Sequence, residues 1–273
     1  MTKLANYLER IQLQEQKDPL KSATLIYIIG VIIITILLIM SYYLSSKRNI
    51  HLEAILRKIT GKKYFVRILE NQYPNAFCFG GFGSTIFLTN KLVNILNEKE
   101  VIAVCLHEVG HITTYDSLKN LGIRFTSIGA AGIFYLKLLS KINYSLNSKI
   151  KQVAIFSTAI IISILIVKSP AILVGKFFEY RADKHASKYG YGKELASALE
   201  KIEKWIKEYK YKIFGKPSKL EKMFDKINNF IDVHPTFQHR IEKLLEYEKL
   251  YEAMADNDIK QIKKICKEVL TTG

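Results

Sequence analysis

Residues 97–116 read NEKEVIAVCLHEVGHITTYD, and the rest of the chain is best understood outward from this stretch. Asn97 is a favourable N-cap residue, and Glu100 stands three positions later, where a capping box requires it. The apolar residues that follow keep a helical spacing through Ile112. The stretch therefore predicts one helix, which carries the pattern His-Glu-x-x-His at residues 107–111.

This helix has the arrangement of a zinc-binding element. His107 and His111 are four residues apart, so both imidazoles lie on one helical face and can share a zinc ion. Glu108 lies beside them, within reach of a metal-bound water but turned away from direct ligation. The alternative is an ordinary surface helix, because so short a pattern arises by chance about once in a hundred such sequences. The apolar context and an available third ligand argue against that alternative.

The third ligand is predicted within residues 178–183, FEYRAD. A hydrolytic zinc site takes three protein ligands and leaves one position open. Glu179 and Asp183 are four apart and share a helical face. Glu179 would complete the ligand set, and Asp183 could accept the free ring N–H of a ligating histidine. The alternative is an acidic pair on a solvated helix, the usual meaning of such a pair in isolation. We expect one Zn²⁺ per chain.

Three apolar segments predict membrane-spanning helices. Residues 23–44 contain no charge and are long enough to cross the roughly 30 Å hydrocarbon core. Their length and the lack of a small-residue cleavage site favour a retained anchor over a signal peptide. Residues 121–140 and 152–175 are expected to form an apolar helical hairpin that spans the bilayer; the alternatives are a hairpin that only enters the bilayer and one buried in a soluble domain. Since the two histidines and Glu179 flank this hairpin, it must return the chain to the same side.

The net charge of +16 is informative through its distribution. Residues 45–67 carry seven Lys or Arg side chains against Glu53 alone, directly after the first apolar segment. Basic residues beside a span favour the cytoplasmic side, so we expect a multi-pass plasma-membrane protein whose active site faces the cytoplasm. A net charge of +16 could also indicate a nucleic-acid-binding protein, but the sequence has no recognised nucleic-acid-binding motif. The chain also has 34 Lys and only 7 Arg, and Arg is the residue better suited to contacts with bases.

A small sheet is expected between the first span and the zinc helix. Residues 63–70, 75–79 and 84–89 read as strands, with Gly80, Gly81 and Gly83 at a turn. An exposed strand edge there could hold an extended substrate by main-chain pairing, which suits broad specificity. Beyond the hairpin, residues 193–210 and 240–268 predict amphipathic helices, with a break at 211–217.

Four motifs in order make the chain resemble the HtpX-type family of membrane zinc metalloproteases over roughly residues 45–245. Any one motif is weak, but their order, with an apolar pair between the second and third, is specific. They are Pro74-Asn75-Ala76-Phe77 followed by Gly80-Gly81, His107-Glu108-Val109-Gly110-His111, Glu179-Tyr180-Arg181-Ala182-Asp183, and His234-Pro235 with Arg240-Ile241.

The resemblance implies a mostly α-helical protein with a small β-sheet, an α+β zincin-type catalytic domain joined to membrane-spanning helices. It implies that Asn75, Ala76 and Phe77 form a substrate-binding edge, although a plain strand entry after Pro74 is the simpler local reading. We expect five segments: an N-terminal segment, a span, the two halves of the catalytic domain and a hairpin between the halves. Their bounds are 1–22, 23–44, 45–120 with 176–273, and 121–175.

The predicted activity is zinc-dependent endopeptidase, with a polypeptide substrate and the lipid bilayer as partners and no prediction of oligomeric state. Zinc would lower the pKa of a bound water to about 7, and Glu108 would take its proton and pass it to the leaving amine. His234 would donate to the oxyanion, with Arg240 as second donor or orienter, unless His234 is simply a helix-entry residue before Pro235.

The resemblance further implies misfolded or damaged membrane proteins as substrates, a role in protein quality control. The alternative function is a non-proteolytic membrane scaffold or adaptor with a structural zinc. Structural sites usually fill the fourth position with Cys or His, and Cys105 is placed to face away from the metal. That alternative would also leave Glu108 without a role.

Overall fold

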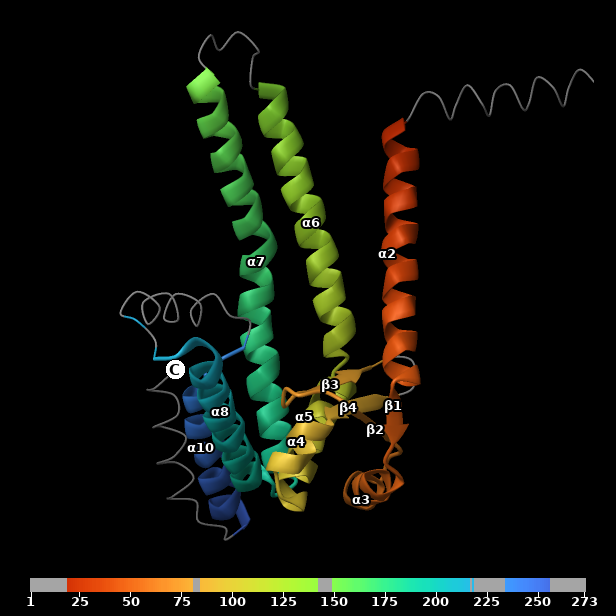
Figure 1. Ribbon diagram of the computed structural model, residues 1–273, viewed down its shortest axis with the longest axis vertical. Helices are drawn as coiled ribbons and strands as arrows, with labels where there is room; N and C mark the ends of the chain where they lie inside the picture. Colours follow the sequence, from red (N-terminus) through yellow and green to blue (C-terminus); the bar gives the residue numbers. More distant parts are fainter. Residues whose placement is uncertain (1–18, 81–83, 142–148, 217, 219–233, 256–273) are drawn as a thin grey trace, which may run out of the picture. The chain divides into compact units, whose positions relative to one another are not determined.

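The computed structural model describes residues 19–80, 84–141, 149–216, 218 and 234–255 (Figure 1). Gly81 and Gly83 of the predicted turn and residues 256–268 of the last predicted helix lie outside these ranges. The chain divides into two compact units, Met1–Lys47 and Arg48–Gly273. Its described elements are, in order, α2 (Pro19–Leu44), β1 (Ser46–Arg48), α3 (Ile50–Thr60), β2 (Phe65–Leu69), β3 (Ala76–Phe79), β4 (Thr85–Thr89), α4 (Asn90–Ile95), α5 (Glu98–Thr113), α6 (Asp116–Lys141), α7 (Lys149–Lys188), α8 (Gly192–Phe214) and α10 (Phe237–Ala255).

The first unit consists mainly of the long helix α2, which contains the apolar segment 23–44. Several of its apolar side chains face outward, with Ile33, Leu37 and Met40 between 51% and 60% exposed. A helical segment that has no charged residue and exposes its apolar side chains, as residues 23–44 do, is the pattern of a lipid-facing helix. That this segment crosses a membrane stays a prediction.

The sheet has the strand order β1-β2-β4-β3 and is mixed. β2 and β4 are parallel, whereas β3 is antiparallel to β4, with Ala76 opposite Leu88 and Phe77 opposite Phe87. The three strands predicted from the sequence are confirmed, each within two residues of its predicted ends. Because β3 is last in the order, its second edge is not paired within the sheet.

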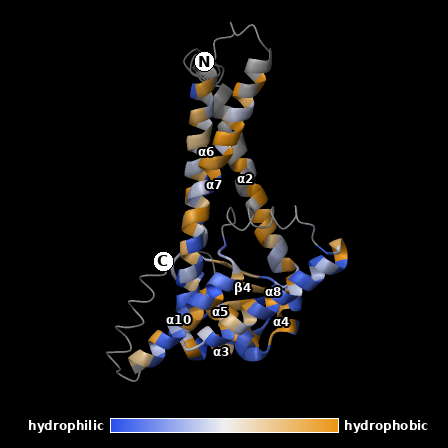
Figure 2. Ribbon diagram, turned by 90° about the vertical axis from the view of Figure 1, so that its left-hand side faces the viewer, coloured by the Kyte–Doolittle hydropathy of each residue, from blue (hydrophilic) through white to orange (hydrophobic). Residues whose placement is uncertain are grey.

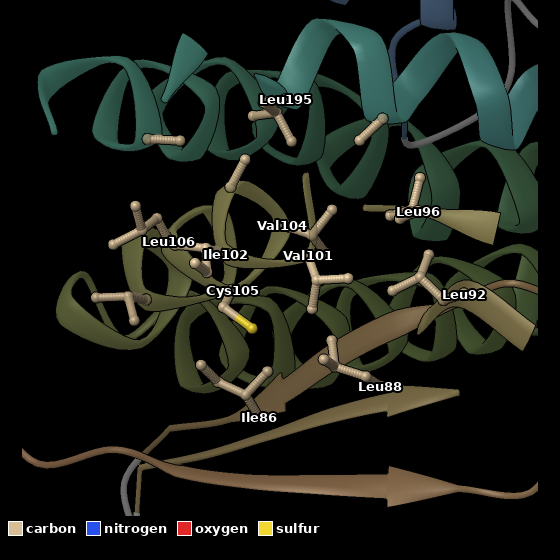
Figure 3. Packing of buried hydrophobic residues seen from close by; sticks show 14 of the residues in the cluster. Ile86, Leu88, Leu92, Leu96, Val101, Ile102, Val104, Cys105, Leu106 and Leu195 are labelled. Carbon is tan, nitrogen blue, oxygen red and sulfur yellow. The ribbon is translucent and has the colours of Figure 1, made fainter. Parts of the chain in front are cut away.

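Helix α5 forms the centre of the second unit. Ile86 and Leu88 of β4 point toward Val101 and Cys105 on one side of α5, and Leu195 of α8 approaches from the opposite side (Figure 3). Ile86, Leu88 and Cys105 are fully buried. A helix covered on two sides is held rigidly, and any group on its third side is placed with the same precision.

The capping box predicted at the start of α5 is confirmed. The side chain of Asn97 accepts a hydrogen bond from the Glu100 amide at 3.0 Å, and the Glu100 carboxylate accepts one from the Asn97 amide at 2.8 Å. The Glu100 carboxylate also accepts hydrogen bonds from Ser197 at 2.7 Å and Lys201 at 2.8 Å, both on α8. The cap that starts α5 therefore also fixes α8 against it.

The hairpin consists of α6 and α7, which run side by side (Figure 1). α7 is continuous from Lys149 to Lys188, so the apolar segment 152–175 and the motif of Glu179 and Asp183 belong to one helix. Along α7, apolar residues give way to hydrophilic ones where the helix packs against α5, α8 and α10 (Figure 2). One unbroken helix therefore connects the apolar hairpin to the candidate site.

One helix among the described residues, Ile155–Lys188, is long and apolar enough to cross a membrane, and 11% of its most apolar window is buried. This finding agrees with the prediction for residues 152–175. The prediction of three spans rests on the sequence.

Helices α8 and α10 complete the second unit and pack against each other. The predicted break between them begins later than expected, because α8 continues through Phe214 and ends at Gly215, whose φ of 74° lies in the left-handed region. Residues 211–214 include neither glycine nor proline, so none of them ends the helix. Gly215 is the first residue that readily adopts the left-handed conformation with which helices commonly end. The last predicted helix is confirmed as far as Ala255, although it begins at Phe237.

Candidate metal centre

His107, His111 and Glu179 converge as the sequence predicts. Each offers a ligand atom, and all three atoms lie within 4.8 Å of one another. The Nε2 atoms of the two histidines are 3.1 Å apart, and each lies 3.5 Å from an oxygen of Glu179. Two imidazoles and one carboxylate are the donor set of a catalytic zinc site, so the residues present fit Zn²⁺.

A glycine allows the two helices that carry these ligands to approach closely. A Cβ atom on Gly110 of α5 would lie 2.9 Å from the Cα of Ala182 on α7. The contact is reinforced by His185, whose Nδ1 donates a hydrogen bond to the Leu106 carbonyl at 3.0 Å. The small residues at positions 110 and 182 therefore place Glu179 and Asp183 beside the histidine face of α5.

His107 belongs to a buried network that we call the His107 network, formed with Asp183 and Arg240. Nδ1 of His107 lies 2.9 Å from Asp183, as expected for the ring N–H donating to this carboxylate. Arg240 of α10 donates two hydrogen bonds to Asp183, at 2.6 and 2.9 Å, and its Nη1 lies 3.0 Å from Glu179. The predicted role of Asp183 toward a histidine thus has the required geometry, specifically toward His107.

The His111 network has the same composition: His111, Asp116 and Arg181. Nδ1 of His111 lies 2.9 Å from Asp116, and Arg181 of α7 donates to the same carboxylate. Thr114 donates to Asp116 at 2.8 Å and accepts from Arg181 at 2.9 Å. Each histidine therefore has one ring nitrogen toward the metal position and the other on a carboxylate that an arginine holds.

The sequence interpretation did not assign a role to Asp116 or Arg181. Asp116 reaches back to His111 because Tyr115, between α5 and α6, adopts a left-handed conformation with φ of 56°. A tyrosine rarely adopts this conformation, so the reversal could not be read from residue types. The only feature of the sequence that could have pointed to Asp116 as a partner of His111 was its position five residues after that histidine.

The charges in the site shift its pKa values in consistent directions. Burial disfavours protonated His111, but the Asp116 and Glu179 carboxylates outweigh it and raise the His111 pKa to about 10. Burial likewise disfavours the Arg240 cation, and Asp183 and Glu179 raise its pKa. In the metal-free protein His111 is therefore protonated at neutral pH, and a metal ion has to displace that proton.

The site opens into a cavity of about 520 Å³. Glu108 is 6% exposed and lines this cavity beside the two histidines. His234 also lines it, with an exposed side chain whose Nδ1 lies 3.0 Å from Glu179. Arg240 is instead locked between two carboxylates, so of the two predicted roles its contacts favour orienting over direct donation.

The edge strand β3 borders the same cavity, and all three predicted substrate-binding residues line it. The main chain of Asn75 bonds to Thr89 in both directions, at 2.9 and 3.0 Å, so it faces β4. Successive residues of a strand point their N–H and C=O groups to opposite sides, so those of Ala76 face the open edge. The Phe77 ring stacks on Phe87 at 5.2 Å, which fixes the strand.

A further cavity residue that the sequence interpretation did not assign is Cys78. It lies on β3, next to Glu108, and its main-chain carbonyl accepts a hydrogen bond from Ser117 at 3.3 Å. Burial, followed by the nearby Glu108 carboxylate, raises the pKa of its thiol. The thiol is therefore neutral and adds no charge to the site.

Comparison with known proteins agrees with this geometry. Residues 47–248 match Peptidase family M48. The chain is 31% identical over 156 residues to a protein described as "Protease HtpX homolog" from Halobacterium salinarum, covering 55% of this chain and 51% of that protein. A protein of the same description from Campylobacter concisus is 26% identical over 244 residues, 77% of this chain and 84% of its own length.

Ste24p of S. mikatae shares the fold, with a TM-score of 0.52 and 20% identity over 80% of this chain and 56% of that one. The chain thus spans about half the length of the Halobacterium relative and of this solved structure. The family match, in contrast, covers most of the chain and includes every residue of the candidate site. The chain belongs to Peptidase family M48, among the proteins similar to HtpX.

Proposed function

We propose that the protein is a membrane-anchored zinc endopeptidase. One observation carries this proposal: His107, His111 and Glu179 converge beside the carboxylate of Glu108 on the wall of a cavity that also borders a sheet edge. A structural metal site would need neither an adjacent buried carboxylate nor an edge for an extended chain.

His107, His111 and Glu179 would hold the zinc ion. When bound, zinc supplies Lewis acidity, which makes water nucleophilic at neutral pH and polarises a peptide carbonyl. Asp183 and Asp116 accept the second ring N–H of His107 and His111, which sets both imidazoles with Nε2 toward the metal position.

Glu108 is the proposed general base and acid. Its carboxylate is buried in the cavity wall next to the ligand histidines, and it takes a proton from the attacking water. The same carboxyl group then gives that proton to the nitrogen of the departing amine. This step needs no other titratable group.

His234 is the proposed donor to the oxyanion. Its side chain is 64% exposed and lies at the cavity, so it can turn from Glu179 toward a bound substrate. Arg240 is a positioning residue, because its guanidinium contacts Asp183 and Glu179 from a nearly buried position.

The substrate is a polypeptide bound in extended form along β3. Ala76 presents its main-chain N–H and C=O toward the open edge, while Asn75 and Phe77 hold the strand on β4. We further propose misfolded or damaged membrane proteins as the substrates. In support, α6 begins at the site residue Asp116 and α7 carries Glu179 and Asp183 in its last ten residues, so the cavity lies next to an apolar hairpin.

The membrane is proposed to be the plasma membrane, with the site on the cytoplasmic side. The basic residues 45–67 support this orientation. A topology reporter fused after residue 145 should then report the outside of the cell. A cytoplasmic signal would contradict a spanning hairpin.

The experiment that tests the activity is Glu108→Gln in the full-length protein in lipid nanodiscs. It should keep one zinc ion per chain and lose about 10²–10⁴-fold in casein cleavage, the usual contribution of a general base. Glu98→Gln, on the exposed first turn of the same helix, is the matched control and should change neither. Full cleavage by Glu108→Gln would refute the assignment, and Glu179→Ala should instead lower the zinc content.

A further inference from the structure

The last part of α8 extends beyond the body of the domain. Near its start the helix is packed into the core, with Leu195 and Leu199 at most 5% exposed. From Lys210 to Lys216, in contrast, every residue is exposed. We call residues 210–216, which read KYKIFGK, the α8 tip. Because most of the stability of a protein helix comes from packing of its apolar face, a helix that continues through exposed apolar residues indicates a contact outside the domain.

The α8 tip carries large apolar side chains that face solvent. Phe214 is 79% exposed, Ile213 51% and Tyr211 49%. The exposure of Phe214 is comparable to that of Leu44 at the end of α2, at 83%, and of Leu173 on α7, at 73%. Both of those residues belong to segments predicted to face lipid. Neighbouring apolar side chains that stay exposed mark a surface that binds a partner or a membrane.

The α8 tip is also basic. It contains Lys210, Lys212 and Lys216 and no acidic residue. One turn earlier the balance is different, because Lys207 lies 2.8 Å from Glu203 and its charge is compensated. Lysines interleaved with aromatic and aliphatic side chains on one helix end are typical of segments that lie in the interface of an anionic membrane, where the rings and aliphatic groups leave water and the ammonium groups meet phosphates.

The course of α8 brings the tip back toward the hairpin. α8 begins at Gly192, just after α7 ends at Lys188, and packs against α7. Its first turn is held at the far end of α10, where Lys193 lies 2.5 Å from Glu252. From there α8 rises toward the hairpin, and its last turn lies at the level where α7 changes from hydrophilic to apolar (Figure 1, Figure 2). Its 23 residues extend about 35 Å, more than the roughly 18 Å of α7 between Lys176 and Lys188.

The chemistry of the tip favours lipid over a protein partner. Successive residues of a helix are about 100° apart, so Tyr211, Ile213 and Phe214 point to different sides of α8. A protein groove covers one face of a helix, whereas headgroups and acyl chains can surround its end. A second copy of the chain would bring two tips of like charge together. The cytoplasmic leaflet, in contrast, is anionic and attracts lysines next to a membrane-spanning helix.

We propose that the α8 tip docks on the bilayer, with Phe214 and its apolar neighbours among the headgroups of the anionic leaflet next to the hairpin. This inference rests on the proposed function, which places the hairpin in the membrane. The first half of α8 contributes Leu195, Leu199 and Ile202 to the cavity. Docking at the other end of the same helix therefore holds the cavity against the lipid surface at a second point, in addition to α6 and α7.

Tryptophan fluorescence tests the contact, because the chain has a single tryptophan, Trp205. Trp205→Phe keeps an aromatic ring against Tyr209 and gives a background into which one tryptophan is placed at a time. Phe214→Trp reports on the tip. Ile161→Trp, at a 59% exposed position of the apolar part of α7, reports on the hairpin, and Met254→Trp, 53% exposed near the end of α10, is the matched control away from the tip.

Each full-length variant is measured in nanodiscs of phosphatidylcholine and phosphatidylglycerol, with two kinds of quencher. Phosphatidylcholine that carries a nitroxide near its headgroup should quench the tryptophan of Phe214→Trp, and acrylamide in the water should quench it weakly. A nitroxide near the chain end should be the stronger quencher for Ile161→Trp. For Met254→Trp only acrylamide should quench. Wild-type zinc content and circular dichroism show that a variant is folded, and Tyr211→Trp is a second reporter at the tip.

Charge reversal tests the anionic partner. Combining Lys210→Glu, Lys212→Glu and Lys216→Glu with the tip reporter should lower the ratio of docked to free tip by about 100-fold or more, seen as loss of quenching by the headgroup nitroxide. Nanodiscs of phosphatidylcholine alone should weaken the quenching of the unaltered tip in the same direction. The matched control reverses three exposed lysines elsewhere in the domain and should leave the quenching unchanged; these are Lys99, Lys188 and Lys249.

The outcomes separate the docking from the proposed function. Lipid quenching of Ile161→Trp together with quenching of Phe214→Trp by acrylamide alone would overturn the docking and leave the membrane-anchored peptidase in place. Protection of Phe214→Trp from both quenchers would also overturn it, because another part of the protein would then cover the tip. Quenching of Ile161→Trp by acrylamide alone would contradict the hairpin in the bilayer and, with it, the inference. Headgroup quenching that survives the charge reversal would overturn the anionic partner.

Discussion

The His107 and His111 networks contain the same three kinds of residue, but they differ in burial and in how the chain forms them. In the His107 network the side chain of Asp183 is fully buried and that of Arg240 is 10% exposed. In the His111 network Asp116 is 3% exposed, but Arg181 is 29% exposed. The first network is therefore part of the core, and the second lies at its margin.

The networks also join different parts of the protein. The His107 network brings together α5, α7 and α10, so it exists only once three distant segments have packed. The His111 network joins the end of α5 to the first residue of α6 and to α7, and Arg181 also lies over the rings of Phe177 and Phe178. The comparison indicates that one histidine is held by the core of the domain and the other by the base of the hairpin.

The largest expected effect comes from removing the arginines. Arg240→Met leaves Asp183 and Glu179 as buried carboxylates without their cation, so we expect a loss of about 3–5 kcal/mol in unfolding free energy. Arg181→Met should cost less than half as much, because Asp116 keeps Thr114 and His111 as partners and Arg181 is partly exposed. Denaturant unfolding of the metal-free proteins measures both. Equal losses of unfolding free energy in the two variants would show that the deeper burial of Arg240 does not make its network more important for stability.

The next effect concerns zinc affinity. Asp183→Asn and Asp116→Asn each remove the carboxylate that orients a ligand histidine, and such changes typically cost 10–100-fold in metal affinity, about 1.4–2.7 kcal/mol. We expect the larger loss for Asp183, whose site is fully buried, and the smaller for Asp116. Competition with a chelator of known affinity measures each. Wild-type affinity for Asp116→Asn would mean that the hairpin base does not position His111.

The smallest effect tests the third partner of Asp116. Thr114→Val removes its hydrogen bonds to Asp116, Arg181 and the Gly110 carbonyl and should reduce stability by about 1 kcal/mol, with a smaller loss of zinc affinity than Asp116→Asn. Thr113→Val is the matched control, because the Thr113 hydroxyl bonds only to the Gly110 carbonyl. If the control and Thr114→Val behave alike, the hydroxyl of Thr114 has no part in the His111 network.

The elements nearest α5 were the most predictable from sequence. The strands, the capping box of Asn97 and Glu100, and the convergence of Glu179 with the two histidines were each predicted and are present. Periods of two and 3.6 residues are local properties, so the sequence displays them directly. The roles assigned to these site residues, and the three spans, stay predictions.

The features that were missed depend on contacts between segments or on unusual backbone. Asp116 reaches His111 only through the left-handed conformation of Tyr115, and Arg181 gains its role only because α7 packs on α5. Arg240 had two possible roles, and only its burial between Asp183 and Glu179 favours one.

The sequence by itself determined which groups are available for metal binding and in what order, because the spacing of His107, His111 and Glu179 along helices defines the face on which each must lie. The tertiary structure decided which carboxylate serves which histidine. The physical reason is that helical periodicity determines on which face of its own helix a residue lies, but not which other helix packs against that face. That choice depends on close backbone contacts, such as Gly110 against Ala182, which form only when α5 and α7 pack.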